Sequence, residues 1–431
     1  MEIDASIYDT AEYKRSRLAV MNKAHVEWFV HLLAMDAFLA KLLTHVGMED
    51  ALVGVISTIS QLACTFQLLS FLIVPRIRNV KRFVLPLQTF GQLMFVSLYL
   101  VPLLEVEGNL RSILMVVAII LAYFGYMVST VVCARWGNSF VDPHHRAEFS
   151  TTKEMISGLL GLGVSFGVGF MLDAFEADGD IRTGFLFTAI AMLVFATCEL
   201  VCTLMIKNEI RPAKDPDRPS TREVLKCTLG NRDFLNLTAL FAAYHFGLYF
   251  TVGFFGTYQL QELGFSVGAV SVIGVAAMLV RSLLSRPIGI YSDRKSFAKG
   301  IELGMVIAVV SFLAAAFATP QVPWLIIVQA VLYQTSVAGG GSNFVNCVYS
   351  YVDGRCFSQA LSVMNTIGGI SSFVASILGS MLLSHIQANG NMFFGMPVYG
   401  QQVMAVISVV IIIFCLLFNR LVVQKQKIMI Q

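Results

Sequence analysis

The feature that most constrains this fold is a succession of apolar segments, each about 20 residues long, separated by polar turns. Twenty residues of α-helix rise about 30 Å, which is the thickness of the hydrocarbon core of a bilayer. The segments therefore predict an all-α membrane protein with twelve transmembrane helices, at residues 26–46, 51–74, 83–104, 112–133, 155–173, 183–206, 235–258, 266–286, 298–319, 322–348, 359–384 and 400–423.

The composition supports a membrane protein. Of the 431 residues, 56% are hydrophobic and only 13% are charged, whereas ordinary soluble domains carry about 25% charged residues. The eight cysteines form no C-x-x-C pair, so the sequence indicates neither a disulfide framework nor a zinc site. Residues 1–23 are polar and lack the apolar core of a cleavable signal peptide.

The segments are grouped as six, a polar linker, and six. This grouping predicts a cytoplasmic N-terminal segment, an N-terminal six-helix bundle, a cytoplasmic linker, a C-terminal six-helix bundle and a cytoplasmic tail, at residues 1–25, 26–206, 207–234, 235–424 and 425–431. Pro212, Pro216 and Pro219 exclude a membrane span from the linker. Residues 8–23 and 220–231 are candidates for short surface helices, the second with Ser220 and Glu223 as a capping box. A solvated connector is the equal alternative for both segments.

The distribution of positive charge predicts the orientation. Of the 30 Lys and Arg residues, Arg111 and Arg182 lie in outer loops and Lys41 and Arg281 lie within spans, which leaves 26 in the tails, the linker and the loops of one side. Positive charge concentrates on the cytoplasmic side of membrane proteins. We therefore expect both termini to be cytoplasmic. The compact loops and tails favour a multi-pass protein of a prokaryotic inner membrane.

The two halves contain matching segments. Residues 47–56 and 264–273 align without gaps and share Gly, Val, Val and Ile at the same positions, each at the outer turn between the first two spans of its half. Met155 follows Arg146 by nine residues, and Met364 follows Arg355 by the same number. Two parallel six-helix repeats are predicted, with a binding site between them.

The segment 286–295 reads as a tight charged hairpin between the eighth and ninth spans. We expect Pro287 to end the incoming helix, because proline lacks an N–H group and its ring clashes with the preceding turn. Gly289 is expected to allow another backbone to come close, and Asp293 and Arg294 to cap and pair at a helix end.

This hairpin, with its Gly-x-x-x-Asp-Arg spacing, resembles the cytoplasmic loop signature of the major facilitator superfamily. The six-plus-six arrangement and the paired loops extend the resemblance over the whole chain, and it implies two six-helix bundles. It also implies an inner gate formed by Arg286, Gly289, Asp293, Arg294, Arg146 and Arg355. The first-half copy of the signature departs from the pattern, with Phe71 and Pro75 where Gly and Asp would stand. The fifth span also lacks the Gly/Pro signature of proton-driven drug exporters.

Charged and polar residues within the spans are candidates for transport, because ionisable groups are costly in the bilayer. At 100° per residue, Glu27, His31, Lys41 and His45 fall within about 40° of one line on the first span and are predicted to face a cavity. Snorkelling to the interface is the alternative for Glu27 and His45. Asp36 points to the opposite side, either as a protonatable coupling group or as half of a helix–helix hydrogen bond.

Other candidates lie in the remaining spans. His245 could shuttle a proton and Tyr249 could stack on a solute, with packing as the alternative. Arg281 could clamp an anionic solute, but an ion pair with Glu199 is the reading we favour. Gly339, Gly340 and Gly341 are expected to give a flexible backbone. Uncharged cavity groups, for which interhelical bonding is the alternative, are Gln61, Tyr126, Gln334, Asn343 and Asn365.

These residues predict a secondary active transporter, a symporter or antiporter, that moves a small polar solute by alternating access. Asp36, His31 and His245 leave H⁺ or Na⁺ coupling open, and no cofactor is expected. A uniporter, an efflux exporter, a membrane sensor and a membrane-embedded enzyme are the alternatives. No H-E-x-x-H, G-x-S-x-G or G-x-x-x-x-G-K-[ST] motif is present, so catalytic residues and metal ligands are not predicted. We expect a monomer whose partners are the solute and the bilayer, with no nucleic acid.

Overall fold

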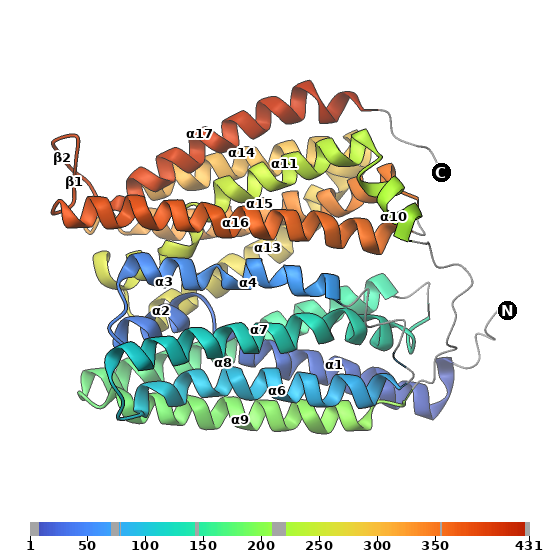
Figure 1. The fold of residues 1–431 in the computed structure, drawn as a ribbon, viewed down its shortest axis with the longest axis horizontal. Coiled ribbons are helices and arrows are strands. Elements are labelled where there is room, and N and C mark those ends of the chain that lie inside the picture. Colours follow the sequence, from blue (N-terminus) through green and yellow to red (C-terminus); the bar gives the residue numbers. More distant parts are fainter. Residues whose placement is uncertain are drawn as a thin grey trace. The chain divides into compact units, whose positions relative to one another are not determined.

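A computed structural model describes residues 8–69, 77, 79–142, 146–208, 221–353 and 356–426. These residues are almost entirely helical (Figure 1). The helices are α1 (Ala11–Leu32), α2 (Asp36–His45), α3 (Asp50–Ser57), α4 (Ile59–Leu62), α6 (Val80–Leu100), α7 (Gly108–Asn138), α8 (Arg146–Ala177), α9 (Ile181–Met205), α10 (Thr221–Thr228), α11 (Arg232–Tyr249), α12 (Phe255–Thr257), α13 (Val267–Lys295), α14 (Phe297–Ala316), α15 (Trp324–Tyr351), α16 (Phe357–Ala388) and α17 (Gly400–Leu421). A two-stranded hairpin is formed by β1 (Met392–Phe393) and β2 (Met396–Pro397).

Ten helical segments of the described residues are long and apolar enough to cross a membrane. They confirm the prediction of an all-α membrane protein, while the count of twelve spans stays a prediction. The two predicted spans outside this set are the first, which is broken, and the tenth. The tenth corresponds to α15, a 28-residue helix that carries Gln334, Asn343 and three consecutive glycines among its apolar residues.

The chain divides by its internal contacts into two compact units. Unit 1 comprises Met1–Met48, Phe66–Asp215 and Val267–Ser271, and unit 2 comprises Glu49–Thr65, Pro216–Ser266 and Val272–Gln431. Within unit 1, α1, α6, α7, α8 and α9 run alongside one another; within unit 2, α11, α14, α15, α16 and α17 do so (Figure 1). Helix α13 begins in unit 1 and continues in unit 2. These units are defined by contacts, whereas the six-helix bundles at 26–206 and 235–424 are predicted from hydropathy. The bundle boundaries therefore stay a prediction.

The first spans of the two halves are broken at matching positions. Gly264 follows Gly47 by 217 positions, and both have the left-handed backbone that glycine permits, with φ of 71° and 92°. The same offset relates Leu32, where α1 ends, to Tyr249, where α11 ends. Irregular backbone follows in both halves: a turn before α2, and the 3₁₀ turn Val252–Phe254 after α11. The local structure therefore repeats where the sequence predicts a repeat.

The break in the first span corrects the prediction of one helix over 26–46. The backbone of Asp36 has φ of 50°, a left-handed conformation, and α2 starts there as a separate helix. The Tyr99 hydroxyl donates to the Leu33 carbonyl at 2.6 Å, which satisfies a polar group that the break exposes. Because angular positions do not carry across a break, the predicted alignment of Lys41 and His45 with Glu27 is wrong.

The prediction that Pro287 ends the eighth span is also wrong. Helix α13 continues through Pro287 to Lys295, and the turn to α14 is made at Ser296, whose side chain accepts from the Lys299 amide. Long membrane helices tolerate an internal proline where neighbouring groups and side-chain hydroxyls satisfy the backbone. Gly289 lies in open space rather than against another backbone.

The two predicted surface helices have different outcomes. Residues 221–228 form α10, as expected, although Ser220, the predicted cap, lies outside the described residues. Residues 8–23 do not form a separate helix, because α1 starts at Ala11 and runs without interruption to Leu32.

Closely packed glycines join α14 to α15. An added Cβ at Gly304 would lie 2.7 Å from the amide nitrogen of Gly340, and one at Gly300 would lie 2.3 Å from the side-chain nitrogen of Asn343. Gly300 and Gly304 form a small-xxx-small pair, which lets membrane helices approach closely. The predicted flexible backbone at Gly339–Gly341 is thus part of a continuous helix in close contact with its neighbour.

We expect Gly304→Ala to lower the free energy of unfolding by about 1–3 kcal/mol, because the new methyl group would force two backbones apart. The matched control is Gly289→Ala on α13, where the added Cβ meets no atom within 4 Å. Thermal melting of both purified variants in detergent measures the difference. Equal melting temperatures would contradict the packing role assigned to Gly304.

Candidate functional site

A buried cluster of charged residues lies among α1, α6 and α9 in unit 1. Lys23, Glu27 and His31 are spaced four residues apart on α1, so they lie on one face of that helix. Gln88 of α6 and Glu199 of α9 complete the cluster. Lys23, Gln88 and Glu199 are each at least 95% buried, which is rare for charged side chains that lack partners.

The ammonium of Lys23 is held between two carboxylates. Its Nζ donates to Oε2 of Glu27 at 2.8 Å and lies 3.4 Å from Oε1 of Glu199. The other Glu27 oxygen accepts from Nε2 of Gln88 at 3.0 Å. Glu27 is therefore well hydrogen-bonded, whereas neither Glu199 oxygen accepts a hydrogen bond of normal geometry from the described residues.

While the His31 imidazole is neutral, the charges of this cluster do not balance when Lys23, Glu27 and Glu199 are all ionised. Two carboxylates and one ammonium leave one negative charge without a partner, in a part of the bundle that is shielded from water. Burying an uncompensated charge costs several kcal/mol, and a bound proton removes that cost. Glu199, which has the poorer hydrogen bonding of the two carboxylates, is the group best placed to hold the proton.

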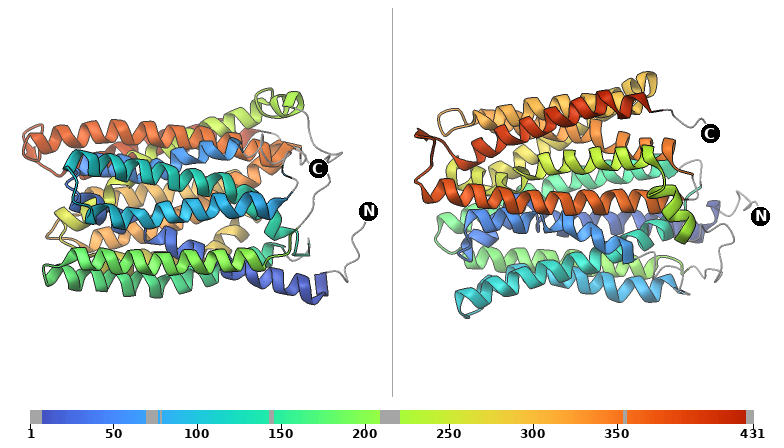
Figure 2. Two further views of the ribbon diagram at one scale, coloured as in Figure 1. Left: turned by 60° about the horizontal axis from the view of Figure 1, so that its bottom comes forward. Right: turned by 45° about the horizontal axis from the view of Figure 1, so that its top comes forward.

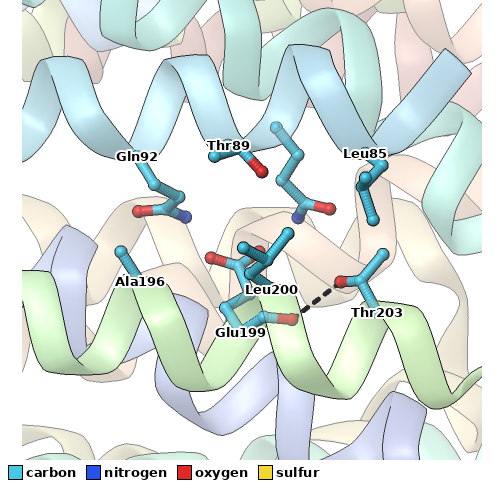
Figure 3. Close-up of a pocket in the computed structure, with 8 residues that line it drawn as sticks. Leu85, Thr89, Gln92, Ala196, Glu199, Leu200 and Thr203 are labelled. Carbon is cyan, nitrogen blue, oxygen red and sulfur yellow. Dashed lines mark hydrogen bonds between the residues drawn. The ribbon is translucent and has the colours of Figure 1, made fainter.

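A small cavity lies beside Glu199 (Figure 3). It offers about 10 Å³, the space of about one water molecule. Side chains of α6 and α9 line it: Leu85, Gln88, Thr89, Gln92, Ala196, Glu199, Leu200 and Thr203. The oxygen of the Gln92 amide is also buried without a hydrogen bond from the described residues.

His31 extends the cluster toward α7. Its ring packs edge-on against Tyr126 and Phe95, with ring centroids 3.9 and 4.8 Å away. Its Nε2 is buried without a hydrogen-bond partner among the described residues. The structure therefore brings together two residues that the sequence named, His31 and Tyr126, and His31 lies one helical turn from Glu27 on α1.

Lys41 and His45, the other polar residues of the first span, are held within unit 1. Lys41 forms an ion pair with Glu176 of α8, and the ring of His45 packs edge-on against Phe185 of α9. Asp36 is exposed, and its carboxylate has no partner among the described residues. The predicted alternative of a buried helix–helix hydrogen bond is therefore not what the structure shows for Asp36.

Unit 2 contains two further groups of predicted residues. His245 packs against Phe241 and Tyr249, with ring centroids 4.0 and 5.7 Å away, and its Nδ1 lies 3.4 Å from the Ser372 hydroxyl. Nη1 of Arg281 donates to Oε1 of Gln334 at 3.3 Å. Arg281 thus contacts Gln334 within unit 2 and Glu199 lies against Lys23 within unit 1, while the favoured pairing of Arg281 with Glu199 stays a prediction.

The remaining uncharged candidates do not gather at one site. Asn343 is buried and donates to the Gly339 carbonyl of its own helix at 2.6 Å. The carbonyl of Gln61 lies close to Gly369 of α16, so α4 and α16 pack tightly there. The side chains of Gln61 and Asn365 are half-buried, and the structure brings neither of them to the other candidates.

The predicted gate residues are exposed at the end of α13. Arg286, Asp293 and Arg294 form no ion pair with any part of the chain that the structure describes. Arg294 lies in the last turn of the helix, where positive charge is favourable. The Arg146 side chain and all of Arg355 lie outside the described residues.

The sequence interpretation missed Lys23 and Gln88 and gave Glu199 a different partner. Lys23 was assigned to the cytoplasmic tail, although its spacing of four from Glu27 is the spacing of a helical ion pair. Glu199 is the one acidic residue between Ile181 and Met205. Because an ionisable group within a membrane span is costly, its presence there indicates a functional site. No periodicity of the sequence indicates that Gln88 meets them.

The chain was compared with known families and structures. The family model for the Major Facilitator Superfamily matches residues 28–376. A search of curated proteins finds no significant match. Among solved structures, the nucleoside transporter NupG aligns with a TM-score of 0.69 and 13% identity, covering 95% of this chain and 99% of that one.

Two other solved structures are similar over nearly the full length. A bacterial homologue of the human lysosomal transporter Spinster, inward-facing and unoccupied, has a TM-score of 0.71 at 15% identity, with 96% and 98% of the two chains covered. An auto-inhibited peptide transporter of the POT family has a TM-score of 0.73 at 12% identity, with the same coverage. At these identities the likeness shows the fold alone.

We expect Lys23→Met to lower the free energy of unfolding by about 3–5 kcal/mol, because it leaves two buried carboxylates without a cation. The matched control is Lys41→Met, whose partner Glu176 is half-exposed; surface pairs contribute only about 0–1 kcal/mol. Denaturant unfolding of both variants in micelles provides the measurement. Equal losses would show that the Lys23 cluster is not a desolvated charge centre.

Proposed function

The chain belongs to the major facilitator superfamily and is a multi-pass membrane transporter, and we propose that it is a secondary active transporter of a small polar solute in which a proton on the Lys23–Glu27–Glu199 cluster is the coupling ion. The family match places it among transporters rather than enzymes. The unequal number of positive and negative groups in the buried cluster is the observation that carries the proposal of a proton.

The cluster is suited to coupling because its charge depends on one proton. With Glu199 protonated, Lys23 and Glu27 form a neutral pair, and the buried region of α1, α6 and α9 carries no net charge. Loss of that proton leaves a net negative charge, which water or a rearranged Lys23 must then stabilise. A change in helix packing that admits water therefore becomes linked to proton release. His31, one turn along α1, is the proposed next proton site.

The solute site is proposed to use the breaks in the first spans. Helices that are interrupted inside the membrane present unpaired backbone groups, which transporters use to bind polar solutes. The break before Asp36 and the matching break after Tyr249 provide such groups in both halves. Within unit 1 the exposed Asp36 carboxylate, and within unit 2 His245 and the Arg281–Gln334 pair, are the side chains proposed to contact a polar solute.

A contact between α8 and the start of α13 is proposed to close the external end. Both carboxylate oxygens of Asp173 accept from backbone amides, Oδ1 from Val267 at 2.9 Å and Oδ2 from Gly268 at 2.7 Å. An added Cβ at Gly169 would lie 3.0 Å from Cα of Gly268. A carboxylate at a helix N-terminus is stabilised by the helix dipole, and such a contact is weak enough to break in each cycle.

The orientation and the inner gate complete the proposal. We place both termini and the end of α13 on the cytoplasmic side of a cell membrane, because positive charge concentrates there. Arg286, Gly289, Asp293, Arg294, Arg146 and Arg355 are then the cytoplasmic gate that the family resemblance implies. A monomer is sufficient, since all the proposed sites lie within one chain. A uniporter with a structural ion cluster is the competing function.

We expect Glu199→Gln to transport solute without response to a pH gradient, because the amide cannot exchange a proton. Uptake into proteoliposomes, with and without a pH gradient, provides the measurement. The panel contains nucleosides and peptides, after the nucleoside and peptide transporters of similar fold, together with sugars and organic acids. Asp178→Asn, an exposed acidic residue of an outer turn, is the control and should keep the response of the parent.

Two outcomes would contradict the coupling proposal. An unchanged pH response in Glu199→Gln would show that another group carries the proton. A parent that follows a sodium gradient, or no gradient at all, would replace the proton with sodium or make the protein a uniporter.

We expect Asp173→Asn to open the external end more often, because the amide keeps one acceptor oxygen and directs its NH₂ donor at the second backbone N–H group and the negative charge at the helix N-terminus is lost. A cysteine introduced by Ser271→Cys, at a buried position in the first turns of α13, reports that opening. Its labelling by a membrane-impermeant maleimide should be about fivefold faster when Asp173→Asn is also present, the population shift that corresponds to a loss of about 1 kcal/mol. Asp178→Asn is the control. A labelling rate that Asp173→Asn leaves unchanged would exclude a latch at this position.

A further inference from the structure

The loop between α16 and α17 forms a hairpin with an unusual tip. Strand β1 pairs antiparallel with β2, with Phe393 opposite Met396. The turn residues Phe394 and Gly395 have φ of 48° and 78°, so both central positions are left-handed, as in a type I′ turn. Figure 2 shows this hairpin at the end of α16, beyond the last turn of the helix.

Phe394 is poorly suited to its place in the turn. Asn, Asp and Gly are the preferred residues at the first central position, and a bulky residue with positive φ is strained there. The ring of Phe394 packs edge-on against that of Phe393, with centroids 4.5 Å apart, yet Phe394 is 88% exposed. The burial of Phe394 within the chain therefore does not offset the strain.

The exposed side chains of the hairpin are apolar. Met392 is 43% exposed and Met396 is 58% exposed, on either side of Phe394. The sequence contains no Lys, Arg, Asp or Glu between Arg355 and Arg420, so the hairpin also lacks charge. The outer turn between α8 and α9 is different, because it carries Glu176, Asp178 and Asp180. An apolar, uncharged tip indicates a partner of low polarity.

The surface next to the hairpin indicates which partner that is. Helix α17 is among the ten membrane-crossing segments, and an exposed apolar stripe runs along it at Val406, Val410, Ile413 and Phe414. Met381, near the end of α16, is 66% exposed. Acyl chains cover these side chains in a bilayer. The hairpin continues the same apolar surface at the end of the spans, at the level of the lipid headgroups.

We propose that the 392–397 hairpin is a lipid-binding anchor whose Phe394 ring inserts at the boundary between headgroups and acyl chains. Aromatic side chains are enriched at that boundary, because rings are stable between the polar headgroups and the apolar chains. Insertion of the ring removes its apolar surface from water and offsets the strain of the turn. The anchor holds the external ends of α16 and α17 at a constant depth in the membrane.

The test places a tryptophan at the tip of the full-length protein. Phe394→Trp and the parent are reconstituted into phosphatidylcholine vesicles, and the parent spectrum is subtracted to remove the three native tryptophans. We expect the emission of the introduced tryptophan to be shifted to shorter wavelength and to be quenched by lipids brominated near the headgroup. Asp178→Trp, in the acidic turn between α8 and α9, is the control and should show water-like emission without quenching.

Two results would overturn the anchor. Water-like emission without quenching, as in the control, would show that the tip projects into solvent. Emission at short wavelength without quenching by brominated lipid would place the ring against protein, such as a second copy of this chain. Phe394→Asn, which suits the turn, should keep the parent's melting temperature in detergent, and a loss of folding there would show that the ring is a structural part of the unit.

Discussion

The structure depends on one constraint, that every backbone polar group within a bilayer must find a partner inside the protein. Long helices meet it along most of the described residues, and among the interruptions are two at matching positions in the first spans of the two halves. At the first break the Tyr99 hydroxyl serves the carbonyl of Leu33, while in the second half the Thr251 and Ser408 hydroxyls lie 2.7 Å apart beside the break. Such breaks are costly in a bilayer, and the polar side chains beside them lower that cost.

Buried charged groups are subject to the same requirement for a partner inside the protein. Lys23 and Glu27 alone would form a neutral pair, yet Glu199 approaches from a third helix and leaves the cluster with an excess carboxylate. A purely structural cluster would be more stable without that carboxylate, because a buried ion pair already costs desolvation. In contrast, Glu302 of unit 2 meets Lys299, Arg420 and Gln424 at a helix end, where positive charge exceeds negative charge. Glu199 thus lies where negative charge is in excess, whereas Glu302 lies where positive charge is in excess.

The parts of the fold that the sequence predicted are those that depend on local properties. Apolar length located the spans, and the glycines at 47 and 264 located equivalent turns, because only glycine adopts their backbone without strain. Pro287 was misread because a proline weighs against a helix in isolation, whereas packing and a membrane environment keep α13 continuous. The break near Asp36 has no proline or glycine to announce it. The meeting of Lys23 with Glu199 joins residues 176 positions apart, which no local pattern encodes.

The sequence by itself determined that this chain is a helical membrane protein with matching segments in its two halves, since hydropathy and glycine conformation act on each segment separately. Only the tertiary structure decided which polar residues share a site. Side-chain partners depend on the rotation and spacing of helices distant in the chain, which are set by close contacts such as those of Gly300 and Gly304 with α15. For that reason the candidate residues were recognised one by one, while the cluster of Lys23, Glu27, Gln88 and Glu199 emerged from packing alone.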